Sequence, residues 1–127
     1  MPHHQKHFSV EEARALLPTL RRLFQEAQQA QRELTRREDA LAKRLTQTGG
    51  DVGGTETGIM MRWLLRLTVC LRQITDTGIV LKDMERGLVD FPHMRDGREV
   101  FLCWELEEDD IEFWHDMDAG YAGRERL

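Results

Sequence analysis

The stretch Gly87–Asp116, GLVDFPHMRDGREVFLCWELEEDDIEFWHD, decides how the second half of the chain folds. Its apolar runs GLVDF, REVFLCWEL and IEFWHD have strand length and are separated by Asp96-Gly97 and by the acidic segment EEDD. An Asp-Gly pair between alternating apolar residues is typical of a tight β-hairpin. Together with GIVLKD, which precedes the turn MERG, the stretch predicts a four-stranded antiparallel meander over residues 78–116.

The acidic segment suggests a register for the last two strands. If Leu106 pairs with Ile111 across EEDD, then Leu102 faces His115 and Glu105 faces Glu112. Because side chains alternate between faces, one face becomes the core face and the other carries the acids. The predicted core face contains Val100, Leu102, Trp104, Leu106, Ile111, Phe113 and His115.

A metal site is one interpretation of the acidic face. The residues from Glu99 to Asp118 include nine acids and no Lys or Arg, and two facing carboxylates need a cation or a neighbouring arginine. The alternative is that the acids point into water or pair with Arg21 or Arg22. No fixed ligand spacing is present, so we expect no cofactor and keep a divalent metal as the alternative. The candidate ligands are Cys103, Glu105, Glu112, His115, Asp116 and Asp118.

Catalytic chemistry finds little support in the sequence. His115 lies beside Asp116, as a general acid or base can, but the predicted register places it on the apolar face. No nucleophile elbow, phosphate loop or zinc-protease motif accompanies it. Cys70 and Cys103 lie within apolar patterns and fit buried thiols of a reducing cytosol, and the N-terminus lacks a signal peptide. We therefore predict no catalytic residue and a cytoplasmic protein with no membrane partner.

The first half of the chain predicts a helical hairpin over residues 9–77. Ser9 and Glu12 form a capping box, and apolar residues then recur every three or four positions to Leu45. Pro18 either bends this helix or marks the start of its regular part. The glycine-rich segment 48–58 is a mobile connection to a second helix, which begins near Ile59 and ends before Gly78.

The length of the first helix suggests a homodimer. A helix from Ser9 to Leu45 would be about 55 Å long, whereas the second helix would span only about 30 Å. The second helix cannot cover all of the first, so a second copy of the chain would pack on the uncovered leucines. The alternative is a monomer whose helix breaks or frays after Arg37. The predicted interface residues are Leu34, Leu41 and Leu45.

The net charge, the N-terminal segment and the C-terminal tail each support a further prediction. The net charge is −5, and acids alternate with the arginines of the first helix, so nucleic-acid binding is not favoured. His3, His4 and His7 could bind a metal loosely, but a disordered leader is the preferred interpretation. In the tail, residues 117–127, Gly120 and Gly123 bracket Tyr121, which predicts an ordered turn with Arg124 close to the acids.

The segments FSVEEARALLPTL at 8–20 and KDMERGLVDFPHMRDGREVFLCWELEEDDIEFWHDMDAGYAGRERL at 82–127 resemble a bacterial family described as domain of unknown function 2203. The motifs GLVDFP, DGREVFLCW and WHDMDAGYAGR carry the resemblance in this order. The resemblance covers nearly the whole chain and implies a bacterial cytosolic protein. It implies no activity and no catalytic residues.

These features predict a single α+β domain over residues 1–127, a long helical hairpin packed on a small antiparallel meander. Three classes of function remain open. We favour a non-catalytic interaction or assembly module that self-associates through its long helix or binds another protein, because the chain has long amphipathic surfaces and displays no reacting group. The alternative is a protein, enzymatic or not, that binds a metal or small ligand through the acidic face and His115. A nucleic-acid-binding protein ranks third.

Overall fold

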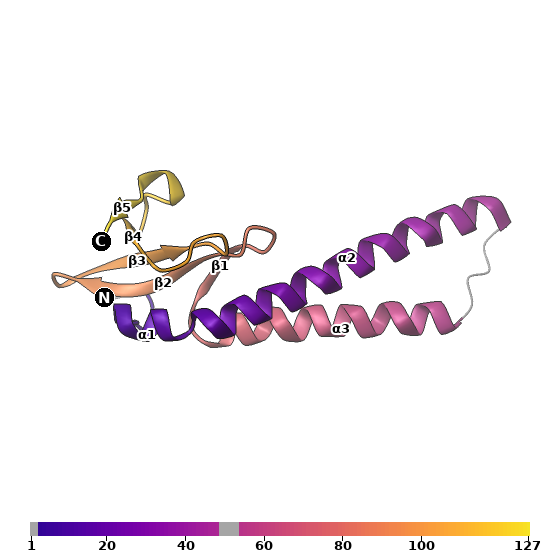
Figure 1. Ribbon diagram of the computed structural model, residues 1–127, viewed down its shortest axis with the longest axis horizontal. Helices are drawn as coiled ribbons and strands as arrows, with labels where there is room; N and C mark the ends of the chain where they lie inside the picture. The colour runs from indigo at the N-terminus through magenta and orange to yellow at the C-terminus, as the bar shows by residue number, and fades with distance from the viewer. Residues whose placement is uncertain (1–2, 49–53) are drawn as a thin grey trace.

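The computed structural model describes residues 3–48 and 54–127, which form a helical hairpin and an antiparallel sheet (Figure 1). The α+β class predicted from the sequence is confirmed. None of the helices in the described residues is long and apolar enough to cross a lipid bilayer. In chain order the elements are α1 Val10–Ala15, α2 Leu17–Thr48, α3 Gly54–Asp76, β1 Val80–Asp83, β2 Leu88–Arg95, β3 Arg98–Trp104, β4 Phe113–Asp116, a 3-10 turn at Tyr121–Gly123, and β5 Glu125–Arg126.

The N-terminal helix is divided at Leu16. Ser9 and Glu12 form the predicted capping box, each accepting a hydrogen bond from the other's backbone N–H at 3.0 Å. α1 then ends because Pro18 has no N–H with which to continue its hydrogen-bond ladder to Arg14. Pro18 instead occupies the first turn of α2, where a missing N–H costs nothing. Of the two predicted outcomes for Pro18, a new helical start is the correct one.

α2 and α3 pack as an antiparallel hairpin that extends away from the sheet and opens toward its far end (Figure 1). α3 begins at Gly54, earlier than predicted, so Gly54–Gly58 are helical and not part of a loop, while residues 49–53 of the predicted connection lie outside the described residues. Leu34 is buried within the chain, since it is only 8% exposed. The prediction that Leu34 lacks a partner within the chain is therefore wrong. Leu41 is half-buried and Leu45 is exposed.

The sheet has five antiparallel strands in the order β1-β2-β3-β4-β5, one more than predicted, because the tail adds β5 beside β4. The hairpin between β2 and β3 turns at Asp96 and Gly97, whose φ angles are 53° and 77°. Positive φ at both positions is the requirement of a type I′ turn. The predicted Asp-Gly turn is confirmed.

The predicted register between β3 and β4 is wrong by one residue. Cys103 pairs with Phe113 and Phe101 pairs with His115, whereas the prediction paired Leu102 with His115. The EEDD segment is a wider loop than assumed, since the Trp104 indole donates to the Glu108 carbonyl at 2.9 Å and Arg21 donates to three carbonyls of the loop. A slip of one residue moves a side chain to the opposite face. Phe113 and His115 therefore lie on the face of Cys103.

Both faces of the sheet are buried, which also differs from the prediction. The face toward the helices contributes Val89, Phe91, Val100, Leu102 and Trp104 to the main core. The opposite face was expected to display acids to water. Instead the chain ends cover it: the His4 ring packs on Phe101, and Arg124 of the tail packs on the Phe113 ring at 3.9 Å. The predicted ordered tail is confirmed.

Candidate functional site

The covered face of the sheet contains a buried polar cluster made by three neighbouring strands. Asp90 of β2 lies opposite Cys103 of β3, and His115 of β4 lies opposite Phe101, two residues along β3 on the same face. One ligand atom from each of Asp90, Cys103 and His115 lies within 4.8 Å of the other two. These side chains are 2%, 1% and 2% exposed. Rigid strands thus hold a carboxylate, a thiol and an imidazole together out of water.

Hydrogen bonds fix the orientation of the His115 ring. Its Nδ1 lies 2.8 Å from the carbonyl oxygen of Asp116, and its Nε2 lies 3.0 Å from Oδ1 of Asp90. A carbonyl oxygen only accepts, so Nδ1 carries a hydrogen and donates it. Nε2 is the atom that faces Asp90. The carboxylate and the ring therefore meet at Nε2, where a positive charge would stabilise both.

Cys103 is an unreactive thiol in this environment. Burial and, to a smaller extent, the nearby Asp90 carboxylate together raise the pKa of its thiol to about 12, while Arg124 opposes the shift. A cysteine nucleophile needs a lowered pKa and access to substrate. Cys103 has neither, and His115 is also out of reach of a substrate. The cluster is thus suited to holding a proton or a metal and is unsuited to attacking a substrate.

Three of the four acidic candidates on the loop and strands have an arginine as counter-charge. Glu105 accepts hydrogen bonds from Arg86 at 2.5 Å and from the Tyr121 hydroxyl at 3.1 Å. Asp116 pairs with Arg98 at 3.0 Å, and Glu112 lies 3.9 Å from Arg126. Asp118 is exposed.

The structure therefore divides the six candidate ligands. It brings Cys103 and His115 together and separates the four carboxylates from them. Glu105 and Glu112 do not face each other, and their counter-charges are Arg86 and Arg126 in place of Arg21 or Arg22.

Asp90 is the cluster residue that the sequence reasoning missed. It occupies an inward position of the run Leu88–Phe91, all of which is buried. A single acid inside an otherwise apolar strand was the available signal, because an acid there needs a buried partner. Its pairing with Cys103, thirteen residues away, depends on the hairpin register and could be derived from the Asp96-Gly97 turn.

The N-terminal histidines are placed against the sheet, so the prediction of a disordered leader is wrong from residue 3 onward. His7 Nε2 lies 2.9 Å from Glu99, and the backbone N–H of His3 donates to the same carboxylate at 3.0 Å. Burial would raise the pKa of Glu99, but the hydrogen bonds from His7 and from the backbone of His3 and His4 hold it below its ordinary value. Glu99 thus fastens the N-terminal segment.

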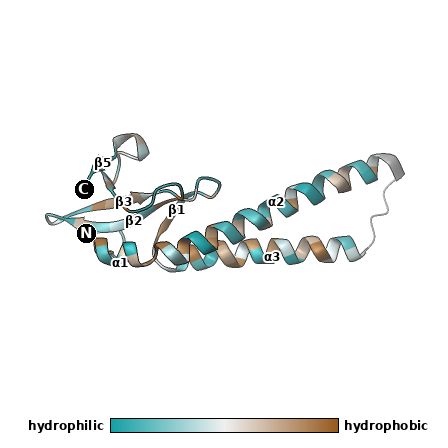
Figure 2. Ribbon diagram, viewed as in Figure 1, coloured by the Kyte–Doolittle hydropathy of each residue, from teal (hydrophilic) through white to brown (hydrophobic). Residues whose placement is uncertain are grey.

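A second candidate site is the outer face of α3. Its inner face packs on α2 through Cys70 and Ile74, whereas four large apolar side chains remain exposed to solvent. Figure 2 shows hydrophobic residues along α3 in brown. Beside them a groove runs between the two helices, with Arg22 and Glu26 on the α2 side and Arg62 and Arg66 on the α3 side. The exposed apolar residues are Met61 at 59%, Leu64 at 47%, Leu65 at 65% and Val69 at 44%.

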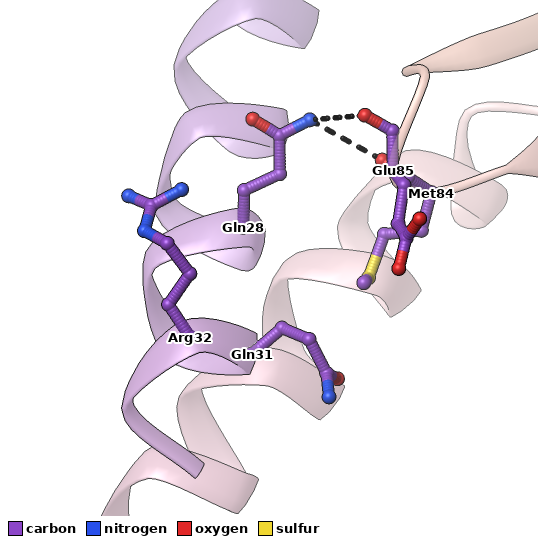
Figure 3. Close-up of a pocket in the computed structure, with 5 residues that line it drawn as sticks. All are labelled: Gln28, Gln31, Arg32, Met84 and Glu85. Carbon is purple, nitrogen blue, oxygen red and sulfur yellow. Dashed lines mark hydrogen bonds between the residues drawn. The ribbon is translucent and has the colours of Figure 1, made fainter. Parts of the chain in front are cut away.

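A third candidate site is a hollow where the hairpin meets the β1–β2 turn (Figure 3). Gln28 spans it and donates to the carbonyls of Met84 and Glu85 at 3.3 and 2.9 Å. The amide group is therefore used to hold the turn against α2. Gln31 and Arg32 line the same hollow without forming a cluster of reacting groups. This hollow therefore has a structural role at the contact between α2 and the β1–β2 turn.

Comparison with known proteins identifies a family. A family model described as an uncharacterized conserved protein, DUF2203, matches residues 6–127. No curated protein and no solved structure matches the chain.

Proposed function

The chain belongs to the family of domain of unknown function 2203, and we propose that it is a non-catalytic assembly module whose helical hairpin packs against a second copy of itself. The observation that carries the proposal is the exposed apolar face of α3, formed by Met61, Leu64, Leu65 and Val69. Contiguous apolar surface of this kind on a helix is typical of an interface. The proposal keeps the homodimer expected from the sequence but moves its centre from α2 to α3.

The spacing of this face favours a second copy over a different protein. Met61, Leu65 and Val69 follow one another at intervals of four residues along one side of α3. A two-fold axis at Leu65 would place Met61 of one copy against Val69 of the other and the two Leu65 side chains against each other. A closed dimer requires such a self-complementary patch.

The charges around the groove support the same arrangement. Among the described residues no ion pair is found for Arg62 or Arg66, while Glu26, which pairs with Arg22 at 3.4 Å, lies across the groove with its side chain partly exposed. A second copy would bring its own arginines toward Glu26. We expect these contacts to set the orientation of the dimer more than its affinity.

Light scattering across micromolar concentrations tests the proposal. We expect the wild type to have the mass of a dimer and Leu65→Glu to be a monomer with an unchanged circular dichroism spectrum, because Leu65 is largely exposed. Leu45→Glu is the matched control, since it places the same charge on α2 and should leave the dimer intact. A monomeric wild type would refute the proposal, and dissociation by Leu45→Glu alone would return the interface to the end of α2.

The remaining elements of the proposal concern partners and location. Nucleic acid is not proposed as a partner because several arginines of α2 are neutralised, as in the pairs Arg22–Glu26 and Arg37–Glu56. A cytoplasmic location in a bacterium is proposed from the family resemblance and from Cys70 and Cys103, which are both free thiols buried in the fold.

A further inference from the structure

The cluster of Asp90, Cys103 and His115 supports an inference that is independent of the assembly proposal. We infer that it is a binding site for a transition-metal ion of the zinc class, held by the Cys103 thiolate, His115 Nε2 and an Asp90 carboxylate oxygen. The three ligand atoms come from adjacent strands and lie within 4.8 Å of one another. A small rearrangement around an ion, in which His115 Nε2 and Asp90 Oδ1 move slightly apart from their 3.0 Å separation, would bring the three atoms to the geometry of a tetrahedral zinc site.

The orientation of His115 is that of a metal ligand. Its Nδ1–H donates to the Asp116 carbonyl at 2.8 Å, which leaves Nε2 directed at Asp90. In a neutral ring with this tautomer, Nε2 has a lone pair and so does the carboxylate oxygen 3.0 Å away. Two acceptors at this distance need a positive charge between them, either a second proton or a metal ion. A backbone carbonyl that holds the distal N–H of a histidine is the usual support of a metal-ligating imidazole.

The donor set selects the class of metal. Thiolate and imidazole ligands favour zinc and related transition metals, whereas magnesium and calcium prefer sites made of oxygen ligands alone. A divalent ion together with one thiolate and one carboxylate has no net charge, which suits a site that excludes water. Binding would release the Cys103 thiol proton and any proton on His115 Nε2. Three protein ligands leave a fourth coordination position for water or another small ligand.

The surroundings are compatible with a cation at the cluster. The positive side chain of Arg124 influences the Cys103 thiol, but Arg124 forms a salt bridge with Glu108 and is partly neutralised. The N-terminal segment covers the same face through the contact of His4 with Phe101, whose ring in turn packs against His115. A metal ion would enter while the chain folds or when this segment detaches.

The test is metal analysis of untagged protein after exposure to zinc and dialysis. We expect about one zinc ion per chain, and a loss of affinity of at least about tenfold in Cys103→Ser and in Asp90→Asn. Cys70→Ser is the matched control, because Cys70 is also a buried free thiol but lies on α3. A double variant His3→Ala/His4→Ala removes two of the three histidines of the N-terminal segment and should retain the metal.

Cobalt substitution gives a second readout that needs no variant. Wild-type protein loaded with Co²⁺ should show a thiolate-to-cobalt charge-transfer absorption, which Cys70→Ser keeps and Cys103→Ser loses. The inference is overturned if the wild type retains no metal and shows no such band. It is also overturned if the metal is lost with His3 and His4 but kept in Cys103→Ser. In either case the cluster is an ion pair closed by a proton.

Discussion

The sheet and the helical hairpin differ in how many partners each surface has. The sheet is buried on both faces, by helices on one side and by the two chain ends on the other, so that even Asp90 and His115 are out of water. Away from the sheet, α3 packs on α2 alone and leaves Leu65 and its neighbours exposed. The sheet region therefore buries its apolar surface within the chain. The helical hairpin leaves an apolar surface on α3 that is available to a partner.

The largest expected contrast comes from the same substitution in the two regions. Leu102→Ala removes a fully buried side chain from β3 and should destabilise the fold by about 2–5 kcal/mol, because a cavity remains in a packed core. Leu65→Ala on α3 should change the stability of the monomer by about 0.5 kcal/mol or less. Denaturant unfolding at dilute protein concentration measures both. Equal losses of unfolding free energy would show that the helical hairpin is packed as tightly as the sheet.

Two glycines sharpen the comparison within the sheet. Gly87 and Gly97 both have positive φ, but a Cβ at Gly87 would lie 2.7 Å from the Leu106 side chain, whereas nothing lies within 4 Å at Gly97. Gly97→Ala should cost about 1 kcal/mol from the backbone alone. Gly87→Ala should cost about 2–4 kcal/mol, because overpacking is added. Thermal unfolding of the two variants would contradict this account if their midpoints were equal.

These positions show which parts of the fold were open to sequence reasoning. The capping box at Ser9 and the Asp96-Gly97 turn were predicted because the residues that make them are adjacent in the chain. The register of β4 was not predicted correctly, because it depends on hydrogen bonds from Arg21 of α2 to the carbonyls of the EEDD loop. A contact of this kind, 87 residues apart in the chain, has no local signature.

The buried cluster also combines features that the sequence predicts with features that depend on distant contacts. Cys103 and His115 were identified as candidate ligands by their chemistry, but the predicted register placed them on opposite faces. The true register brings them together and adds Asp90 from β2. Residue types could thus be chosen from the sequence, whereas their grouping required the ladder between β3 and β4. The cover of this face by both chain ends could not be predicted from local patterns.

The tail can be tested as a cover of the second sheet face. Arg124 packs on the rings of Phe113 and Tyr121 and pairs with Glu108, so Arg124→Ala should destabilise the fold by about 1–2 kcal/mol. Arg126→Ala is the matched control, because Arg126 is exposed and lies farther from Phe113. The loss of unfolding free energy, measured by chemical denaturation, should be larger for Arg124→Ala than for Arg126→Ala. Deletion of residues 119–127 without loss of stability would show that the tail covers nothing.

The smallest expected effect concerns the N-terminal cover and its dependence on pH. Hydrogen bonds from His7 and from the N-terminal backbone lower the pKa of Glu99 against the opposing effect of burial. A carboxyl group whose pKa is lower in the folded state stabilises that state above its ordinary pKa. This contribution is lost as the pH falls through the lowered value. We therefore expect the hold on the N-terminal segment to weaken as the pH falls below about 4.5 and the segment to detach from β3 as the pH passes through the lowered pKa of Glu99, while the rest of the sheet remains folded.

Amide chemical shifts of residues 3–8, followed by NMR during an acid titration, measure this detachment. In Glu99→Gln the side chain cannot ionise, so the acid transition of these amides should disappear and the segment should be less well held at neutral pH. Glu107→Gln is the control, because Glu107 is an exposed acid of the loop and should leave the transition unchanged. An identical transition in Glu99→Gln would assign the fastening of the N-terminus to the Phe8 backbone, whose N–H donates to the Pro92 carbonyl at 2.7 Å.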